Sequence, residues 1–484
     1  MPDMNMPAVF LAIIFLVNIA ISITIIFLER RTPTVTLAWV LVLFMVPIVG
    51  MLFYFLFAQN IARKKIFKLS SYEAEVFNAN LEEQIKDVQN GTFKVNSKVA
   101  LKHKDMIHLN QSYAKAFYTE DNDIEIITDG KKMFERIMTE IRNAKESINV
   151  QYFIIKNDST GKALIKALTQ KALEGVEVRL LVDAMGGRQL FKRHLKNFEV
   201  SGGHYAFFFQ PRFKIINFKI NYRNHRKIVV IDGKKGFLGG FNIADEYLGK
   251  VDKFGYWRDT HLEITGSCVQ DINARFLLDW RFASGENVVL AQAYYNEIQS
   301  RGDKGVQIVS SGPDNNNEAV KQAYLKMITS AKKSIYIQTP YFVPDVSIFE
   351  LLKSAALSGI DVRIMIPKMP DHMFVYWATY SYVGILMESG VKVYIYDNGF
   401  LHAKTMVVDG EVSSIGSANF DIRSFRLNFE CNAFIYDEQF SENAKNIFLN
   451  DLLKSHELTP ALYHSRPLWI RFKESISRLL SELL

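Results

Sequence analysis

The sequence predicts an α/β protein made of two similar α/β/α sandwich repeats, related by a pseudo-two-fold axis and preceded by a hydrophobic helical hairpin. Three observations lead to this prediction. Residues 1–60 contain two long apolar stretches, helical and strand patterns alternate from Asp123 onward, and the second half of that region repeats the first. Helices that alternate with apolar strands indicate sheets covered on both faces.

The bulk composition is that of a folded protein with an anionic partner. The 484 residues suffice for two or three domains, and 49% apolar and 13% aromatic residues exclude disorder. The net charge of +7 suits lipid headgroups, nucleic acid or phosphorylated substrates, although a merely basic soluble surface gives the same value. Cys268 and Cys431 are the only cysteines, which excludes a Cys-based zinc site or a disulfide framework.

The N-terminal hairpin is predicted to attach the chain to a membrane. Residues 7–28 carry no charge over about 22 positions, enough to cross a bilayer, and residues 34–58 are again uncharged. A cleaved signal peptide is disfavoured because no Lys or Arg precedes the first stretch and the second follows at once. Two complete spans and a re-entrant pair both remain open.

Basic residues predict the orientation of this hairpin. Two lie between the apolar stretches and four follow the second, so the positive-inside tendency favours a cytoplasmic body after the hairpin. These residues are Arg30 and Arg31 in the loop, and Arg63, Lys64, Lys65 and Lys68 after it.

Residues 61–122 are polar and read as a linker with lead-in helices, and residues 123–290 and 291–484 as the two repeats. Strands are expected from the apolar runs and helices from the amphipathic ones that end at glycine. The predicted strands are 124–127, 147–153, 176–182, 306–310, 334–338 and 361–366, and the helices are 132–143, 161–174, 318–331 and 347–358. The repeats also match as sequence, Ala144–Gln151 with Ala331–Gln338 and Gly175–Arg179 with Gly359–Arg363.

Each repeat carries one copy of the motif H-x-K-x4-D-G late in its length. On a strand, the His and the Lys point to the same face. A small-residue turn ending in Asn follows each copy at the same distance, so its amide is expected to donate to a ligand. The predicted site residues are His225, Lys227, Asp232 and Asn242 in the first repeat, and His402, Lys404, Asp409, Ser417 and Asn419 in the second.

These residue types fit chemistry on a phosphate. Two lysines neutralise the phosphate and the charge that develops on it, while one imidazole attacks phosphorus and the other protonates the leaving oxygen. No H-E-x-x-H, acidic metal cluster or Walker loop is present, so neither metal nor cofactor is predicted. The alternative, a surface strand with a basic face, would have to arise twice with matched tails.

A nucleophilic histidine needs a carboxylate to fix its tautomer, and two residues on alternating strands suit this role. Glu430 shares a face with Asn428 and Asn432, and Asp259 shares one with Trp257 and His261. An ordinary charge at a strand edge is the alternative for each.

Together these motifs resemble the phospholipase D superfamily, and the closer resemblance, over nearly the whole chain, is to bacterial cardiolipin synthases. One departure is Gly240, where many superfamily members have Ser; one fewer hydroxyl contact to phosphate is expected. The markers are the N-terminal apolar pair, Ile154–Asp158, Asn221–Asp232, Tyr256–His261, Thr339–Asp345, Leu401–Asp409, Ser417–Glu430 and Arg478–Leu484.

The resemblance implies transphosphatidylation at the bacterial plasma membrane. In that reaction one His attacks phosphatidylglycerol, glycerol leaves, and a second phosphatidylglycerol takes the phosphatidyl group to give cardiolipin. The resemblance assigns the attack to His225 and the acid/base role to His402, whereas the near-symmetric copies alone leave this open. The implied partners are phosphatidylglycerol and other membrane lipids without nucleic acid; a homo-oligomer is compatible with the sequence.

Three other functions are alternatives to this one: a phospholipase D-type hydrolase, a nuclease and an inactive lipid-binding scaffold. The apolar stretches argue against the nuclease and the intact His–Lys pairs against the scaffold. Two further segments suit a lipid interface. Phe207–Lys219 interleaves aromatic residues and cations, and the tail from Arg466 has apolar residues at helical spacing, so it docks on the body or lies on a membrane.

Overall fold

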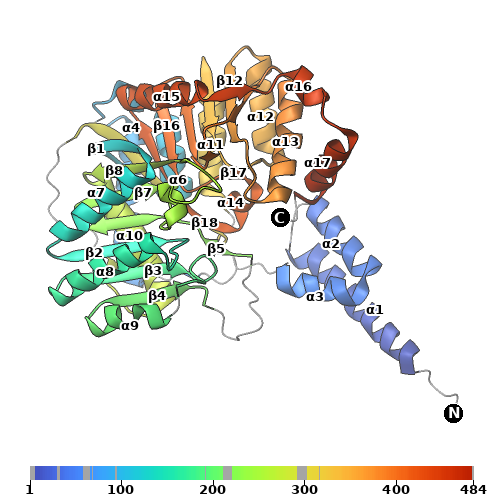
Figure 1. The fold of residues 1–484 in the computed structure, drawn as a ribbon, viewed down its shortest axis with the longest axis horizontal. Coiled ribbons are helices and arrows are strands. Elements are labelled where there is room, and N and C mark those ends of the chain that lie inside the picture. Colours follow the sequence, from blue (N-terminus) through green and yellow to red (C-terminus); the bar gives the residue numbers. More distant parts are fainter. Residues whose placement is uncertain are drawn as a thin grey trace.

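The structure, a computed structural model, consists of an α/β body from which the N-terminal helices project (Figure 1). It describes residues 6–29, 33–57, 66–67, 69–92, 95–190, 192–210, 221–290, 302–315 and 317–481. Three parts of the chain used in the predictions lie outside these ranges: all six basic residues that predict the orientation of the hairpin, the part of the interleaved segment from Pro211 to Lys219, and the last three residues.

The apolar N-terminal stretches form helices that pack on one another around Ile25, Leu43 and Tyr54. A break falls at Pro47, which has no N–H to continue the helical hydrogen bonds. Within the described part of the chain, no single helix combines the length and apolar character needed to span a bilayer. The elements are α1 (Met6–Thr24), η1 (Ile25–Glu29), α2 (Pro33–Met45) and α3 (Pro47–Phe57).

The predicted linker region folds into helices that pack on the second repeat. Ser70 and Glu73 form a reciprocal capping box at the start of the first of these helices. Met106 and Ile107 lie in the same hydrophobic cluster as Tyr324 of the second repeat. The helices are α4 (Ser71–Asn90), α5 (Lys98–Lys102) and α6 (Lys104–Ala114).

Strand β1 (Tyr118–Asp129) begins before Asp123 and joins the two repeats. Its later part pairs antiparallel with β8 (Trp257–Thr265) of the first repeat, and its start pairs with β9 (Lys304–Ser311) of the second. The body is therefore one continuous unit rather than two separate sandwiches.

In the first repeat, the strand between Lys227 and Asp232 of the motif, β6, lies beside the predicted strand 147–153. β2 pairs parallel with β3 and antiparallel with β6, and β6 pairs with β7 on its other side, so this motif strand lies at the centre of the sheet. The remaining elements of this repeat are α7 (Gly130–Asn143), β2 (Ser147–Tyr152), α8 (Ser159–Leu173), β3 (Glu177–Asp183), α9 (Lys192–Val200), β4 (His204–Phe208), β5 (Arg223–Asn224), β6 (Ile228–Ile231), β7 (Lys235–Gly239), η3 (Asp245–Leu248) and α10 (Cys268–Ser284).

The second repeat has the same pairings, as the sequence duplication predicts. β10 pairs parallel with β12 and antiparallel with β15, and β15 continues through β16 to β18 as β6 does through β7 to β8. Its elements after β9 are α11 (Ala319–Ser330), β10 (Ser334–Gln338), β11 (Phe342–Val343), α12 (Val346–Leu357), β12 (Asp361–Pro367), α13 (Met373–Met387), β13 (Lys392–Tyr396), β14 (Phe400–Leu401), β15 (Thr405–Val408), β16 (Val412–Gly416), β17 (Phe420–Asp421), α14 (Ile422–Arg426), β18 (Asn428–Tyr436), α15 (Glu438–Leu452), β19 (Ser455–Glu457), α16 (Pro460–His464) and α17 (Leu468–Leu480).

The helices cover the sheets with apolar faces at helical spacing. In α7, Met133, Ile137 and Ile141 are fully buried in a cluster with residues of the sheet, and each stabilises the fold by about 1.5–3 kcal/mol. A separate cluster joins the repeats, with Phe276 and Trp280 of α10 packed in the same core as strand residues of β18. This shared core holds the two motif strands in a fixed relation.

Candidate active site

Each motif histidine follows a two-residue strand that pairs with the other repeat. β5 runs parallel to the start of β18, and the backbone N–H of His225 donates to the carbonyl of Phe429 at 2.9 Å. β14 likewise runs parallel to the start of β8, and the N–H of His402 donates to the carbonyl of Arg258 at 2.7 Å. The two histidines are therefore positioned by strands from the opposite repeat.

The same crossing pairs each histidine with a carboxylate of the other repeat. His225 Nδ1 lies 3.0 Å from both carboxylate oxygens of Glu430, and His402 Nδ1 lies 2.6 Å from Asp259 Oδ2. Both carboxylates are fully buried. A hydrogen on Nδ1 is donated to the carboxylate in each couple, which leaves Nε2 as the nitrogen with a free lone pair. Sequence reasoning singled out both carboxylates, and the structure adds which histidine each one serves.

The two motif lysines are buried beside these couples. Lys227 Nζ donates to the carbonyl of His225 at 2.5 Å, and Lys404 Nζ makes the equivalent bond to His402. Burial lowers the pKa of Lys227 well below its usual value, and the charge of Lys404 lowers it further. Burial also lowers the pKa of Lys404, to about 8. An anion bound between the two ammonium groups would stabilise both in their charged form.

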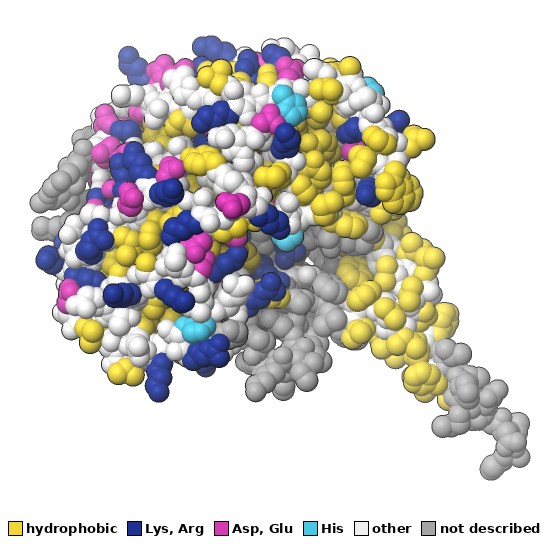
Figure 2. Space-filling model, viewed as in Figure 1, with side chains coloured by type: hydrophobic (Ala, Val, Ile, Leu, Met, Phe, Trp, Pro, Cys, Tyr) yellow, Lys and Arg dark blue, Asp and Glu magenta, His cyan; other side chains and the backbone are white. Residues whose placement is uncertain are grey.

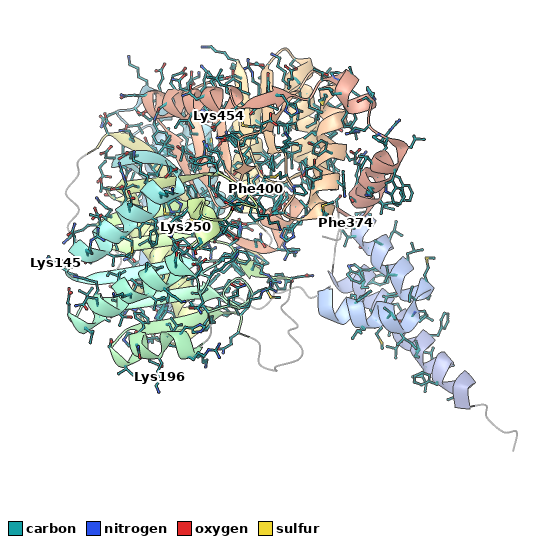
Figure 3. All side chains as sticks on the ribbon, viewed as in Figure 1. Lys145, Lys196, Lys250, Phe374, Phe400 and Lys454 are labelled. Carbon is teal, nitrogen blue, oxygen red and sulfur yellow. The ribbon has the colours of Figure 1, made fainter. Side chains whose placement is uncertain are left out.

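Both histidines are held neutral. Burial lowers the pKa of His402 to about 4, and the charge of Lys404 acts in the same direction. Burial lowers the pKa of His225 too, against the opposing charge of Glu430. Aromatic rings flank the pair: Phe153 lies 5.2 Å from the ring of His225, and Phe400, labelled near the middle of the body in Figure 3, lies 6.1 Å from His402.

The turns after the motif strands differ between the repeats. Ser417 Oγ donates to Glu430 Oε2 at 2.5 Å. At Gly240, the equivalent position, an added Cβ would lie 2.0 Å from Asp259 Oδ1, so the carboxylate occupies the space of a side chain. The hydroxyl missing at Gly240 therefore corresponds to a contact with a carboxylate, whereas the sequence had suggested a contact with phosphate.

The two asparagines predicted to face a ligand bond to the protein. Asn242 Oδ1 accepts from the N–H of Ile154 at 3.1 Å, and its Nδ2 lies 3.4 Å from the Tyr247 hydroxyl. Asn419 Nδ2 donates to Asp421 Oδ2 at 3.1 Å. Each amide holds a segment next to its turn, and each NH₂ group has a second hydrogen.

The motif aspartates, which the sequence placed among the site residues, bond to the backbone of a neighbouring segment. Asp232 accepts hydrogen bonds from the backbone N–H groups of Lys145, Glu146 and Ser147, at distances of 2.7–3.2 Å. Asp409 makes the equivalent bonds to 332–334. The chain from His225 to Asp232 spans roughly 23 Å when extended, so the aspartates lie at the far ends of the strands. They fix the start of the neighbouring strand.

Two further aspartates were missed by the sequence analysis. Asp279 of α10 accepts from Arg226, the residue between His225 and Lys227, at 2.7 and 2.8 Å. Asp451 of α15 accepts from Arg258, next to Asp259, at 2.9 Å. The signal was present, because Phe276–Asp279 (FLLD) and Phe448–Asp451 (FLND) occupy equivalent helices.

These two aspartates serve equivalent networks. Gln151 at the end of β2 donates to Asp279 at 2.7 Å, and Gln338 at the end of β10 donates to Asp451 at 2.9 Å. Each helix is thus tied to the strand beside the motif by a buried, charge-assisted hydrogen bond.

Known proteins are similar to this chain in sequence. The family described as "Cardiolipin synthase, PLD-like domain" matches residues 137–280 and 324–452, and "Phospholipase_D-nuclease N-terminal" matches residues 10–59. The major cardiolipin synthase ClsA of Bacillus subtilis is 48% identical over 99% of this chain and 100% of its own length. A cardiolipin synthase of Staphylococcus aureus is 49% identical over 97% of this chain and 95% of its own.

A solved structure supports the fold alone. Phosphatidylserine synthase of Haemophilus influenzae superposes with a TM-score of 0.57 at 17% identity, covering 78% of this chain and 97% of that chain.

The sequence match with the two cardiolipin synthases extends over the N-terminal helices, both repeats and both motif strands. The chain belongs to the cardiolipin synthase family of phospholipase D-like proteins.

Proposed function

We propose that this chain makes cardiolipin by transferring a phosphatidyl group from one phosphatidylglycerol to another through a covalent phosphatidyl-histidine. The observation that carries the proposal is the crossed pair of couples, His225 with Glu430 and His402 with Asp259, beside two buried lysines. One histidine must attack phosphorus and a separate group must handle the proton of the alcohol, and the two couples supply both.

In the first half-reaction, His225 Nε2 attacks phosphorus and forms the N–P bond while the P–O bond to the headgroup glycerol breaks. The leaving oxygen takes a proton from His402. A phosphodiester anion beside Lys227 and Lys404 offsets their charge, which raises the pKa of His402 from its low value and lets it carry that proton. Asp259 stabilises the imidazolium form of His402 before that proton is transferred.

In the second half-reaction, the terminal hydroxyl of another phosphatidylglycerol gives its proton to His402 Nε2 and its oxygen attacks phosphorus. The P–N bond breaks, His225 is regenerated, and cardiolipin leaves. The two lysines stabilise the negative charge on the phosphoryl oxygens in both steps. No water is consumed, so glycerol and cardiolipin form in equal amounts.

The reaction is tested with the purified chain in detergent and phosphatidylglycerol as the single lipid. Cardiolipin and free glycerol are expected in equal amounts, and EDTA should leave the rate unchanged. Phosphatidic acid as the sole product would favour a hydrolase instead.

The roles of the histidines need a donor that does not depend on the general acid. With a phosphatidyl p-nitrophenol donor, His402→Ala should still release nitrophenolate in a burst and retain labelled phosphatidyl on the protein after denaturation. His225→Ala should do neither. The opposite pattern would assign the attack to His402.

The proposal includes attachment to the bacterial plasma membrane through residues 1–60, with repeats at 123–290 and 291–484 on the cytoplasmic side. Its support is the apolar surface of the N-terminal helices, where Phe27 and Met45 are each 72% exposed. Cysteines placed before α1 and in the body should be labelled by an impermeant maleimide only after the cells are opened, if both lie inside.

A further inference from the structure

Helix α17 packs on the body with its polar side and presents its apolar side outward. Among the side chains of this helix region that the structure describes, the buried ones are those of Glu474, Ser477 and Ser481, at most 3% exposed. The Ser481 hydroxyl lies 3.0 Å from the Tyr382 hydroxyl of α13, and Arg466 pairs with Glu474 at 3.0 Å. A helix that merely closes a soluble core has the opposite orientation, with its apolar side buried.

The outward side is large and apolar. Its members recur at helical spacing, and the patch at the right of the body in Figure 2 is formed by such side chains. Exposed apolar patches of this kind mark sites of protein or membrane interaction. The residues of this outward side are Leu468 (79% exposed), Trp469 (62%), Phe472 (54%), Ile476 (39%) and Leu479 (74%).

Cations border this apolar side. Lys473 Nζ lies 5.4 Å from the ring centres of both Trp377 and Trp469, and Arg478 stacks over Tyr382 at 5.4 Å. Arg471 is exposed on the same helix. Exposed aromatic and aliphatic residues bordered by Lys and Arg are the pattern of helices that lie in the plane of an anionic bilayer.

The surface continues to the active-site side of the body. Met373 and Phe374 begin α13 and are 54% and 42% exposed; Figure 3 labels Phe374 on the side where the N-terminal helices lie. Asp371, two residues before Met373, accepts from the Tyr341 hydroxyl, and β11, which begins at the next residue, pairs with β17 directly after Asn419. A bilayer that contacts α17 and the start of α13 would therefore lie beside the site.

We propose that α17 and the start of α13 form a membrane-docking surface that rests in the headgroup layer of an anionic bilayer. The surface is additional to the N-terminal helices and goes beyond the proposed reaction. It would hold the body so that phosphatidylglycerol reaches the lysines while its acyl chains stay in the leaflet. A second copy of the chain fits less well, because a two-fold contact would bring the same cations together without neutralising them.

Site-specific labelling of the full-length chain tests the surface without relying on activity. An environment-sensitive fluorophore is attached to Leu468→Cys or Phe472→Cys, and to Leu453→Cys as the control, since Leu453 is 85% exposed elsewhere on the body. The proteins are reconstituted in phosphatidylcholine vesicles that contain phosphatidylglycerol. Spin-labelled lipid should quench the α17 labels and iodide should not, whereas the control should show the reverse.

Two results would overturn the proposal. Iodide that reaches the α17 labels as well as the control label would leave the surface in water. Labels shielded from both quenchers would show that a protein covers the surface.

A charge variant gives a second, functional measure. Trp469→Glu with Phe472→Glu should lower cardiolipin formation from vesicle phosphatidylglycerol at least tenfold, yet leave the rate in mixed detergent micelles within twofold. Leu453→Glu should change neither rate. An unchanged vesicle rate, or an equal loss in both assays, would contradict a membrane-docking role.

Discussion

At the scale of single residues, the length of the carboxylate side chain that faces each turn matches the size of the residue in that turn. The shorter Asp259 fills the space beside Gly240, and the longer Glu430 bonds to the hydroxyl of Ser417. We therefore expect Gly240→Ser to displace Asp259, to misorient His402 and to lower kcat by about tenfold or more. Adding Asp259→Glu, which copies the second repeat, should recover much of the loss in the assay of cardiolipin formation.

The matched control for this pair is Gly236→Ala on β7, the strand that ends one residue before Gly240. Its added Cβ would meet its nearest atom at 3.3 Å, so only a small adjustment is needed and near-normal activity is expected. Additive effects of Gly240→Ser and Asp259→Glu, without recovery in the double variant, would show that the two positions are not coupled.

The buried side chain of His261 should make the stability of the fold depend on pH. Burial lowers the pKa of His261 to about 3, and neither ring nitrogen has a hydrogen-bond partner within the described residues. Below pH 6.5 the unfolded chain binds a proton that the folded chain does not. The free energy of unfolding should therefore decrease as the pH is lowered. This residue contributes a decrease on the order of 3 kcal/mol between pH 6.5 and pH 4.

The substitution that tests this is His261→Asn, which copies Asn432 at the equivalent position of the second repeat. Thermal unfolding in detergent should show a smaller loss of Tm on acidification for the variant than for the unsubstituted chain. His402 retains its own contribution, so the dependence is reduced rather than abolished. Parallel Tm profiles for the two proteins would contradict the assignment.

At the scale of elements, periodicity predicted what lies within one repeat. The predicted strand 334–338 matches β10, and the predicted helix 347–358 is displaced by one residue from α12. The crossed pairing could not be predicted, because β5 and β14 have two residues each and no periodicity. The bonds of Asp232 and Asp409 to a neighbouring segment could not be predicted either, because adjacency in a motif does not give proximity to the histidine along an extended chain.

Helices α10 and α15, which follow β8 and β18, stabilise the motif strands through buried hydrogen bonds. Asp279→Asn removes a carboxylate that accepts hydrogen bonds from both Arg226 and Arg275 at 2.7–2.8 Å. Loss of one partner in a buried ion pair costs about 3–5 kcal/mol, so a marked fall in Tm and loss of activity are expected. Glu350→Gln, in an exposed pair with Lys353 at 3.9 Å, should have almost no effect on either measurement. Equal Tm values for the two variants would show that the Asp279 network does not hold the strand.

At the scale of the whole molecule, one chain contains a complete site. Both couples cross between repeats of the same chain, and β1, β9 and β18 link those repeats through one set of paired strands. A mixture of His225→Ala and His402→Ala chains, co-expressed or mixed in detergent, should therefore remain inactive whatever the oligomeric state. A mixture of either variant with the unsubstituted chain should show activity in proportion to the unsubstituted fraction. Recovery of activity in the first mixture would require repeats exchanged between chains, since no other arrangement rebuilds a site with both histidines, and it would contradict the continuous body described above.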